Sequence, residues 1–351
     1  MRRKKHVLSE AEINRLEELR IETDYAVEID NLEVHYQTDR AVVRAVNGIE
    51  LKVSKKSIMG IVGETGAGKT TAMLSLMCLI PSPPGVIKNG RIMVNGIDMR
   101  ALSAKELAAV RGKEISMIFQ DPMTSLNPVM TVGQQIAESI ILHEAVSDAQ
   151  AMEKAKDLLK TVGIAPERYG EYPHQFSGGM RQRVGIAIAL ACRPAVLIAD
   201  EPTTALDVTI QAQVLQLMRE LKEQYDTSLL LITHDLGVVA EMCDEVAVMY
   251  AGKIVEKGSV EDIFERMKHP YTEGLFNSLP NIRNKVSMLK PIDGQIPDPA
   301  DLPEGCSFAP RCPYAMARCH EEQPAARVVS GIHMVECLAY DIPGFSLKGE
   351  C

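Results

Sequence analysis

The most constraining feature of this sequence is a glycine-rich loop, GETGAGKTT, that lies between an apolar run and a helical run. SIMGIV predicts a β-strand directly before Gly63, and TAMLSLM predicts a helix directly after Thr70. Such glycines let the backbone wrap around phosphates, while N–H groups at the helix start and Lys69 attract the anion. We therefore predict a nucleoside triphosphate site in which Lys69 reaches the β- and γ-phosphates and Thr70 ligates magnesium. The predicted nucleotide-binding residues of this loop are Gly63, Glu64, Thr65, Gly66, Ala67, Gly68, Lys69, Thr70 and Thr71.

The pattern of elements along the 351 residues indicates an α/β fold. Short β-like runs begin at Ala26, and strands alternate with helices up to about residue 263, which predicts a mostly parallel sheet covered by helices. Residues 131–165 and 179–193 have helical patterns without intervening strands. We therefore expect a phosphate-loop ATPase core with a β subdomain and a helical insertion at about 121–193, followed by a small cysteine-rich C-terminal domain.

Changes in composition divide the chain into three parts. Residues 1–24 form an N-terminal extension, in which SEAEINRLEELR (9–20) predicts a short charged helix that we expect to be solvated rather than docked. A proline-rich stretch at 279–303 indicates a linker. We expect a nucleotide-binding domain at 25–264 and a C-terminal domain at 265–345.

Charge and hydropathy exclude several classes of function. The net charge of −9 disfavours a nucleic-acid partner bound through a broad basic surface. The sequence contains no run of eighteen or more apolar residues, and its basic start lacks the apolar region of a secretory signal. We therefore expect a chain that neither spans a membrane nor is secreted.

Two carboxylates follow a second apolar run, AVLIADEP. Asp200 at the end of the predicted strand can hold the magnesium shell, and Glu201 can orient and polarise the attacking water. Many core strands end in acidic residues, so the pair alone is weak evidence. It indicates a phosphate-handling site because it follows the phosphate loop at a plausible distance along the chain.

A second anion-binding pattern, QFSGGMRQR, places Ser177, Gly178 and Gly179 at the start of a predicted helix. One nucleotide has no use for two such sites from a single chain. The pattern resembles the signature of ABC ATPases, whose serine and glycines close over the γ-phosphate of a nucleotide held by the partner's phosphate loop. The resemblance implies a head-to-tail pair of ATP-binding subunits, formed with a homologous chain or with a second copy, and two bound ATP molecules.

Other elements of the ABC ATPase family occur in the expected order. Gln120 in MIFQDP resembles the glutamine that senses magnesium and water, and Asp207 in TALDVT resembles the residue that crosses the dimer interface. His234 in LLLITHDL resembles the switch histidine at the γ-phosphate, and Tyr36 stands where the family has an aromatic residue that stacks on adenine. Alone, Tyr36 would be read as a strand residue and His234 as a helix cap. The chain departs from the family at Lys56-Ser57, where Gly-Glu is common, and we expect little effect on hydrolysis.

Four longer stretches resemble the ATP-binding subunits of bacterial and archaeal oligopeptide and dipeptide importers: QDPMTSLNPVMTVGQQIAE, YPHQFSGGMRQR, HDLGVVAEMCDEVAVMYAGKIVEKG and HPYTEGLF. The resemblance runs from about Val27 to Leu338. It implies an ATPase at the cytoplasmic face of the membrane that drives two permease subunits, with an extracytoplasmic solute-binding protein acting indirectly. Import of nickel or another small solute is an alternative, and a non-transport ABC ATPase is a further one.

Four cysteines stand out in the C-terminal part, with the spacing Cys306-x5-Cys312-x6-Cys319-x17-Cys337. Free structural thiols, a zinc site and an iron–sulfur cluster are the three interpretations, and the spacing lacks the paired knuckles typical of zinc. The resemblance to the importer family implies a 4Fe-4S cluster, which is our prediction, with zinc as the alternative. In the nearby HPYT stretch, we expect Pro270 and Tyr271 to form a helix-start turn rather than a contact site.

Overall fold

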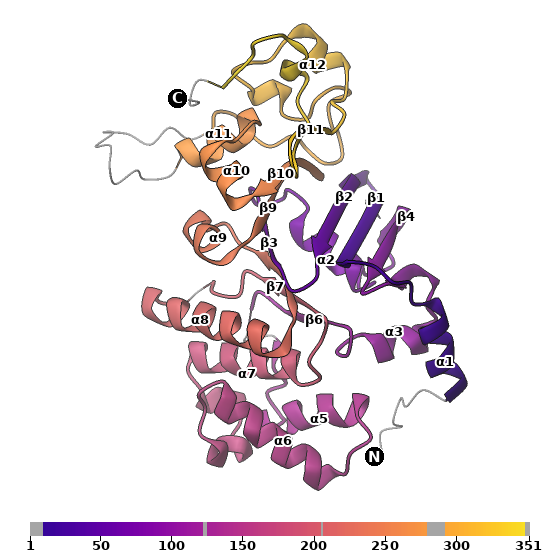
Figure 1. The fold of residues 1–351 in the computed structure, drawn as a ribbon, viewed down its shortest axis with the longest axis vertical. Helices are drawn as coiled ribbons and strands as arrows, with labels where there is room; N and C mark the ends of the chain where they lie inside the picture. The colour runs from indigo at the N-terminus through magenta and orange to yellow at the C-terminus, as the bar shows by residue number, and fades with distance from the viewer. Residues whose placement is uncertain (1–9, 122–124, 205, 279–291, 348–351) are drawn as a thin grey trace.

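The computed structural model describes residues 10–121, 125–204, 206–278 and 292–347 (Figure 1). The strands are β1 (Tyr25–Gln37), β2 (Val42–Ser54), β3 (Ile58–Val62), β4 (Gly85–Val94), β5 (Ile97–Asp98), β6 (Ile115–Ile118), β7 (Val196–Asp200), β8 (Ser228–Ile232), β9 (Glu245–Tyr250), β10 (Lys253–Ser259), β11 (Arg327–Ser330) and β12 (His333–Val335). The helices are α1 (Glu10–Leu19), α2 (Lys69–Leu76), α3 (Ala104–Val110), α5 (Val132–His143), α6 (Asp148–Thr161), α7 (Gly178–Leu190), α8 (Val208–Tyr225), α9 (Leu236–Met242), α10 (Val260–Glu265), α11 (Pro270–Asn277) and α12 (Ala317–Glu321).

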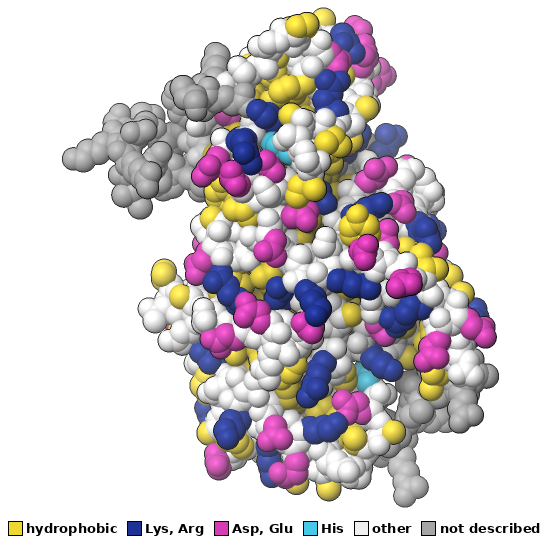
Figure 2. All heavy atoms as spheres, viewed as in Figure 1, with side chains coloured by type: hydrophobic (Ala, Val, Ile, Leu, Met, Phe, Trp, Pro, Cys, Tyr) yellow, Lys and Arg dark blue, Asp and Glu magenta, His cyan; other side chains and the backbone are white. Residues whose placement is uncertain are grey.

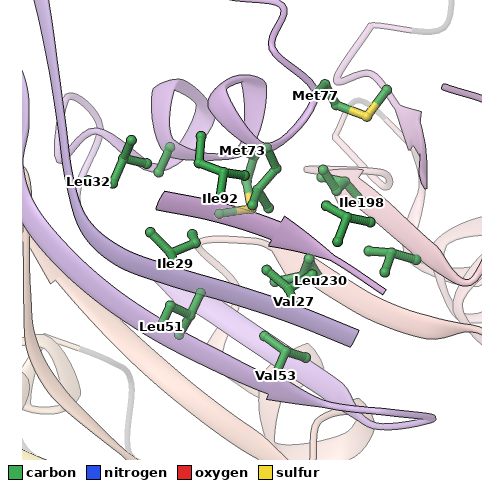
Figure 3. Packing of buried hydrophobic residues seen from close by; sticks show 14 of the residues in the cluster. Val27, Ile29, Leu32, Leu51, Val53, Met73, Met77, Ile92, Ile198 and Leu230 are labelled. Atoms are coloured by element: carbon green, nitrogen blue, oxygen red, sulfur yellow. The ribbon is translucent and has the colours of Figure 1, made fainter. Parts of the chain in front are cut away.

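A four-stranded antiparallel sheet, in the order β2-β1-β4-β5, packs on helix α2. In this sheet Ile29 of β1 lies opposite Leu51 of β2 and Ile92 of β4. Figure 3 shows Ile92 beside Met73 of α2, and these residues share one cluster of buried side chains with Leu230 of β8. This shared core fixes α2, whose first residues follow the glycine-rich loop, between the two sheets.

The large sheet has eight strands in the order β11-β12-β10-β9-β3-β8-β7-β6. Its five strands from β9 to β6 are parallel to one another, and β10 pairs antiparallel with β9. Every residue of β3, β7 and β8 is buried, as is typical of a sheet covered on both faces. Parallel strands end at the same edge, which is where ligands bind in open α/β sheets. Gly63, Asp200 and His234 all lie at or just beyond this edge.

Helices without intervening strands connect β6 to β7 in the described part of the chain. Thr131 and Ser147 begin α5 and α6 with reciprocal caps to Gln134 and Gln150. These helices and α7 form a second buried cluster together with α8. In Figure 1 they lie at the opposite end of the molecule from the C-terminal segment.

The C-terminal segment extends the large sheet rather than standing apart from it. β12 pairs antiparallel with β10, and β11 pairs antiparallel with β12. The fully buried Glu256 of β10 accepts hydrogen bonds from the His269 N–H at 2.9 Å, from His333 Nε2 at 2.8 Å, and from the Lys268 N–H. One carboxyl group therefore connects the sheet, the start of α11 and β12.

The N-terminal helix is docked, which corrects the expectation of a solvated extension. Lys105 Nζ of α3 lies 2.7 Å from Glu12 Oε2, and Arg15 Nη1 lies 3.5 Å from Glu106 Oε1. Leu16 packs against the core cluster beneath. Residues 1–9, including the expected cap at Ser9, lie outside the described residues.

Acidic and basic side chains are interspersed over the face of the molecule seen in Figure 2. This mixture matches an acidic chain that still contains 38 lysines and arginines. Among the helices that the structure describes, none is both long and apolar enough to cross a membrane.

Candidate functional site

The glycine-rich loop connects the end of β3 to the start of α2 in a conformation that requires glycine. Gly63 has a φ of 151°, and a Cβ added there would lie 2.1 Å from the carbonyl oxygen of Met249. Gly68 has a φ of 98°, and its added Cβ would lie 2.3 Å from the carbonyl oxygen of Ala45. Gly68 is also the residue that begins α2, so no side chain caps this helix. The N-terminal amides of α2 therefore face outward without a capping side chain, as in phosphate sites.

Lys69 is the buried cation of this loop. Its side chain is folded back, and Nζ donates hydrogen bonds to the carbonyl oxygens of Gly63 at 2.7 Å and Glu64 at 3.0 Å. Burial lowers the pKa of Lys69, while the charges of Glu201, Asp200 and Glu64 raise it. The backbone carbonyls and these acidic groups offset the cost of burying the ammonium group.

The two carboxylates after β7 have different surroundings. Asp200 is buried, and burial raises its pKa, partly offset by a hydrogen bond with Thr70. Glu201 follows with a φ of 45°, an uncommon conformation for a residue that is not glycine. Asp200 and Thr70 thus lie together beside the phosphate loop, as oxygen ligands for magnesium would.

Three elements converge on the Glu201 carboxylate. Gln120 Nε2 donates to Oε2 at 2.9 Å, and Thr204 Oγ1 donates to the same oxygen at 3.0 Å. His234 Nδ1 lies 3.5 Å from Oε1, and the His234 side chain is 70% exposed. The residues predicted from MIFQDP and LLLITHDL therefore meet at the glutamate predicted from AVLIADEP.

The remaining predicted residues lie at the ends of elements. Ser177 begins α7, with its Oγ accepting a hydrogen bond from the Met180 N–H, and Gly178 and Gly179 form the first turn of the helix. Asp207 begins α8 and accepts a hydrogen bond from the Ile210 N–H. Both side chains act as helix caps within this chain.

Tyr36, in β1, is tied to the start of α2. Its hydroxyl oxygen lies 3.3 Å from Thr71 Oγ1. The side chain therefore stands at the strand edge beside the glycine loop, and the ring is partly exposed. This position is compatible with stacking on a base, although the hydrogen bond also gives the residue a structural role.

Tyr271 contacts the phosphate loop, which corrects the expectation that HPYT makes no contact. Pro270 does begin a helix, α11. The fully buried Tyr271, however, accepts a hydrogen bond from the Glu64 N–H at 2.9 Å. Arg311 of the C-terminal segment also reaches Glu64 and was not singled out by the sequence. A buried partner for a glycine loop has no local signature, because the contact spans hundreds of residues.

Gly63, Glu64 and Thr65 border a cavity of about 490 Å³. His234 lies on another wall, and Leu275, Ser278 and Ile296 of the C-terminal part complete it. The phosphate loop therefore has open space beside it and C-terminal residues as neighbours.

The predicted 4Fe-4S cluster is wrong for this chain. The four cysteines line one cavity of about 20 Å³, which is room for about one water molecule. Among the described residues, no group of three or more His, Cys, Asp or Glu side chains is arranged to hold a metal ion. Burial raises the pKa of Cys312 to about 12 and that of Cys337 to about 11, so both thiols are protonated at neutral pH. As they are placed in this structure, the four thiols form neither the predicted cluster site nor the zinc alternative. They lie among apolar side chains and pack as small apolar groups.

Comparisons with known proteins identify two family regions. Residues 46–204 match the family described as ABC transporter, and residues 255–319 match the family described as oligopeptide/dipeptide transporter, C-terminal region. The chain is 48% identical over 320 residues to the oligopeptide transport ATP-binding protein AppD of Bacillus subtilis, covering 91% of this chain and 98% of that protein. It is 51% identical over 313 residues to the oligopeptide transport ATP-binding protein OppD of Bacillus subtilis, covering 88% of this chain and 87% of that protein.

A solved structure has the same architecture over most of the chain. It is described as the dimeric structure of a post-hydrolysis state of the ATP-binding cassette MJ0796 bound to ADP and Pi. The TM-score is 0.60 at 26% sequence identity, and the match covers 67% of this chain and 98% of that one.

Proposed function

The chain belongs to the ABC transporter family, among the peptide-transport ATP-binding proteins, and on that premise we propose that it hydrolyses ATP to power the import of di- and oligopeptides. The α/β fold is that of the ABC ATPase cassette. We assign nucleotide binding to residues 25–264, with a helical insertion at about 121–193, and a C-terminal region to residues 265–345.

In the proposed ATP site, the loop from Gly63 to Thr71 surrounds the phosphates and Tyr36 stacks on the adenine. Lys69 supplies a positive charge to the phosphates from a site where it is already buried and held by carbonyls. Thr70, Asp200 and Gln120 would hold magnesium, which supplies positive charge that neutralises the phosphate oxygens. The uncapped N-terminus of α2 supports this assignment.

The observation that carries the proposed hydrolysis is the convergence of Gln120, Thr204 and His234 on Glu201. A carboxylate held from three directions beside a phosphate loop is suited to orient a water molecule and to accept its proton. His234 stands on the exposed side, where a γ-phosphate would contact it.

We further propose that two ATP-binding subunits act as a pair. Ser177, Gly178 and Gly179 begin α7, and their helix N-terminus would close over the ATP of the partner subunit, with Asp207 at the interface. The dimeric state described for MJ0796 supports a pair. The partner is a related ATP-binding chain or a second copy of this one.

Membrane subunits complete the proposed transporter. Phe119, next to Gln120, is 45% exposed to solvent. Val129, in the segment before α5, is 79% exposed. Exposed apolar side chains of this kind suit a partner protein. We assign the chain to the cytoplasmic face of the cell membrane, where it would drive permease subunits that receive peptide from an extracytoplasmic binding protein.

The hydrolysis step is tested by Glu201→Gln in the full chain. We expect kcat for ATP to fall by about 100-fold or more, because the proton acceptor is lost, while the Kd for ATP stays within threefold. Glu220→Gln, an exposed change on α8, is the control and should leave both values unchanged. Hydrolysis by Glu201→Gln within threefold of the wild-type rate would refute the role of Glu201.

The transport step is tested in vesicles that contain the chain with its partner and permease subunits. We expect uptake of a labelled dipeptide or oligopeptide to require ATP and to be lost with Lys69→Ala. ATP hydrolysis should also rise when a peptide-loaded binding protein is added. A complex that hydrolyses ATP but neither takes up peptide nor responds to it would contradict the peptide assignment.

A further inference from the structure

Glu64, the second residue of the phosphate loop, has each of its polar groups bound within the chain. Its carbonyl oxygen accepts from Lys69 Nζ at 3.0 Å, and its N–H donates to the Tyr271 hydroxyl at 2.9 Å. Its carboxylate accepts from Arg311 Nη1 at 2.8 Å and from Nη2 at 3.2 Å. Two of the three polar groups are therefore held by residues that follow Glu64 by 207 and 247 positions.

Arg311 is fixed by more than this ion pair. Only 4% of its side chain is exposed, against 29% for Glu64. Nε donates to the carbonyl oxygen of Asp293 at 3.0 Å, and Nη2 donates to that of Ile292 at 3.3 Å. Because the planar guanidinium matches the two oxygens of a carboxylate, the pair sets direction as well as distance.

An aromatic cluster includes Tyr271 and contacts Arg311. The rings of Tyr250, Tyr271 and Phe308 lie with centroids 4.6 to 5.4 Å apart. Arg311 Nη1 also donates to the Tyr250 hydroxyl at 3.3 Å. Tyr271 and Arg311 therefore contact Glu64 from a packed platform, built from β9, α11 and the turn at Ala309–Arg311.

We propose that Tyr271 and Arg311 are positioning residues that hold the phosphate loop in its nucleotide-binding conformation, an inference that rests on the proposed ATP site. Tyr271 fixes the peptide group before Glu64, and Lys69 is bound to the peptide group after it. The orientation of Glu64 therefore determines where Lys69 and the loop N–H groups point.

We call the contacts of Tyr271 and Arg311 with Glu64 the clamp. The clamp acts on nucleotide binding rather than on the chemical step. A loop that is already held in the binding conformation loses less entropy when ATP binds. Without the clamp, only a fraction of the molecules would have a competent loop, and the apparent Kd rises by the inverse of that fraction. Glu201 and its partners are not part of the clamp, so turnover at saturating ATP should be preserved.

Tyr271→Phe in the full chain is the decisive variant, because it keeps the ring and removes only the hydroxyl acceptor. We expect the Kd and KM for ATP with Mg²⁺ to rise about tenfold, the consequence of an unsatisfied Glu64 N–H, with kcat within twofold and a protein that is still folded by circular dichroism. Arg311→Gln should show the same split between KM and kcat. In a double-mutant cycle, Arg311→Gln combined with Glu64→Gln should bind ATP no more weakly than the weaker single variant.

Arg318→Gln is the matched control in the same segment. Arg318 is half exposed and pairs with Glu322 and Asp341 rather than with the loop, so ATP binding should be that of the wild type. A Kd for Tyr271→Phe within twofold of the wild-type value, in a folded protein, would overturn the proposal even if Arg311→Gln fails to fold. Failure of the ATP site itself would appear differently, as wild-type protein that binds ATP no better than Lys69→Ala.

Discussion

Glu256→Gln should loosen the connection between the C-terminal segment and the large sheet. The carboxyl group is fully buried, Oε1 accepts from the Lys268 N–H and His333 Nε2, and Oε2 accepts from the His269 N–H. A glutamine side chain has only one oxygen, so in either orientation its NH2 group faces at least one of these donors. One unsatisfied buried donor costs about 1–3 kcal/mol, and the lost charge assistance adds to it. We therefore expect a loss of about 2–4 kcal/mol in the free energy of unfolding.

Urea unfolding at pH 7, followed by circular dichroism, measures this loss. Glu261→Gln is the control, because Glu261 is 63% exposed and its pair with Arg266 should contribute less than about 1 kcal/mol. A separate early transition would mean that the C-terminal segment unfolds first, whereas a single shifted transition would mean that it unfolds with the sheet. A loss below about 1 kcal/mol would refute the reasoning, since the buried donors would then have found other acceptors.

Two further predictions concern the loop and the C-terminal segment. Gly63→Ala should abolish ATP binding and lower the free energy of unfolding by at least about 2 kcal/mol, because its Cβ would lie 2.1 Å from the Met249 carbonyl oxygen. ATP titration and thermal unfolding measure these effects, with Gly170→Ala as the control because a Cβ there meets no atom within 4 Å. Burial raises the pKa of Glu336 to about 7, so the folded state keeps a proton that the unfolded chain releases near 4.5, and stability falls as pH rises through this window. In urea unfolding, the free energy of unfolding of Glu336→Gln should therefore exceed that of the wild type by about 2 kcal/mol at pH 8 and equal it at pH 4. Glu321→Gln, a change at an exposed residue, is the control.

The sequence could predict the parts of the proposed ATP site because each part is a local pattern. A strand, a glycine loop and a helix are adjacent along the chain, and AVLIADEP ends at the same sheet edge because its strand is parallel to β3. Periodicity thus predicts which strands are buried, and the fold then brings Gln120 and His234 to Glu201. The resemblance to a family supplied the order of these motifs, whereas the distances came only from the structure.

The docked N-terminal helix and the clamp on Glu64 were not predictable in this way. Charges on α1 read as solvated until α3 is seen to offer the opposite charges at Lys105 and Glu106. Likewise, the HPYT stretch predicts the start of α11, but only the fold shows that Tyr271 meets the Glu64 N–H. Contacts between distant segments depend on topology, which neither periodicity nor composition specifies.

The density of cysteines predicted a metal site, and the prediction was wrong because buried thiols can also serve as apolar packing groups. Four thiols within 32 positions suggest a metal site, because few aromatic residues are present to build a core. The segment instead uses Phe308 in an aromatic cluster and places Cys319 with Ala309 and Leu338 in an apolar one. A protonated thiol is a small apolar group, and burial raises the pKa of the Cys312 and Cys337 thiols, which keeps these two protonated. Because Ala309 belongs to the turn that carries Arg311, the cysteines pack against the same turn whose arginine pairs with Glu64.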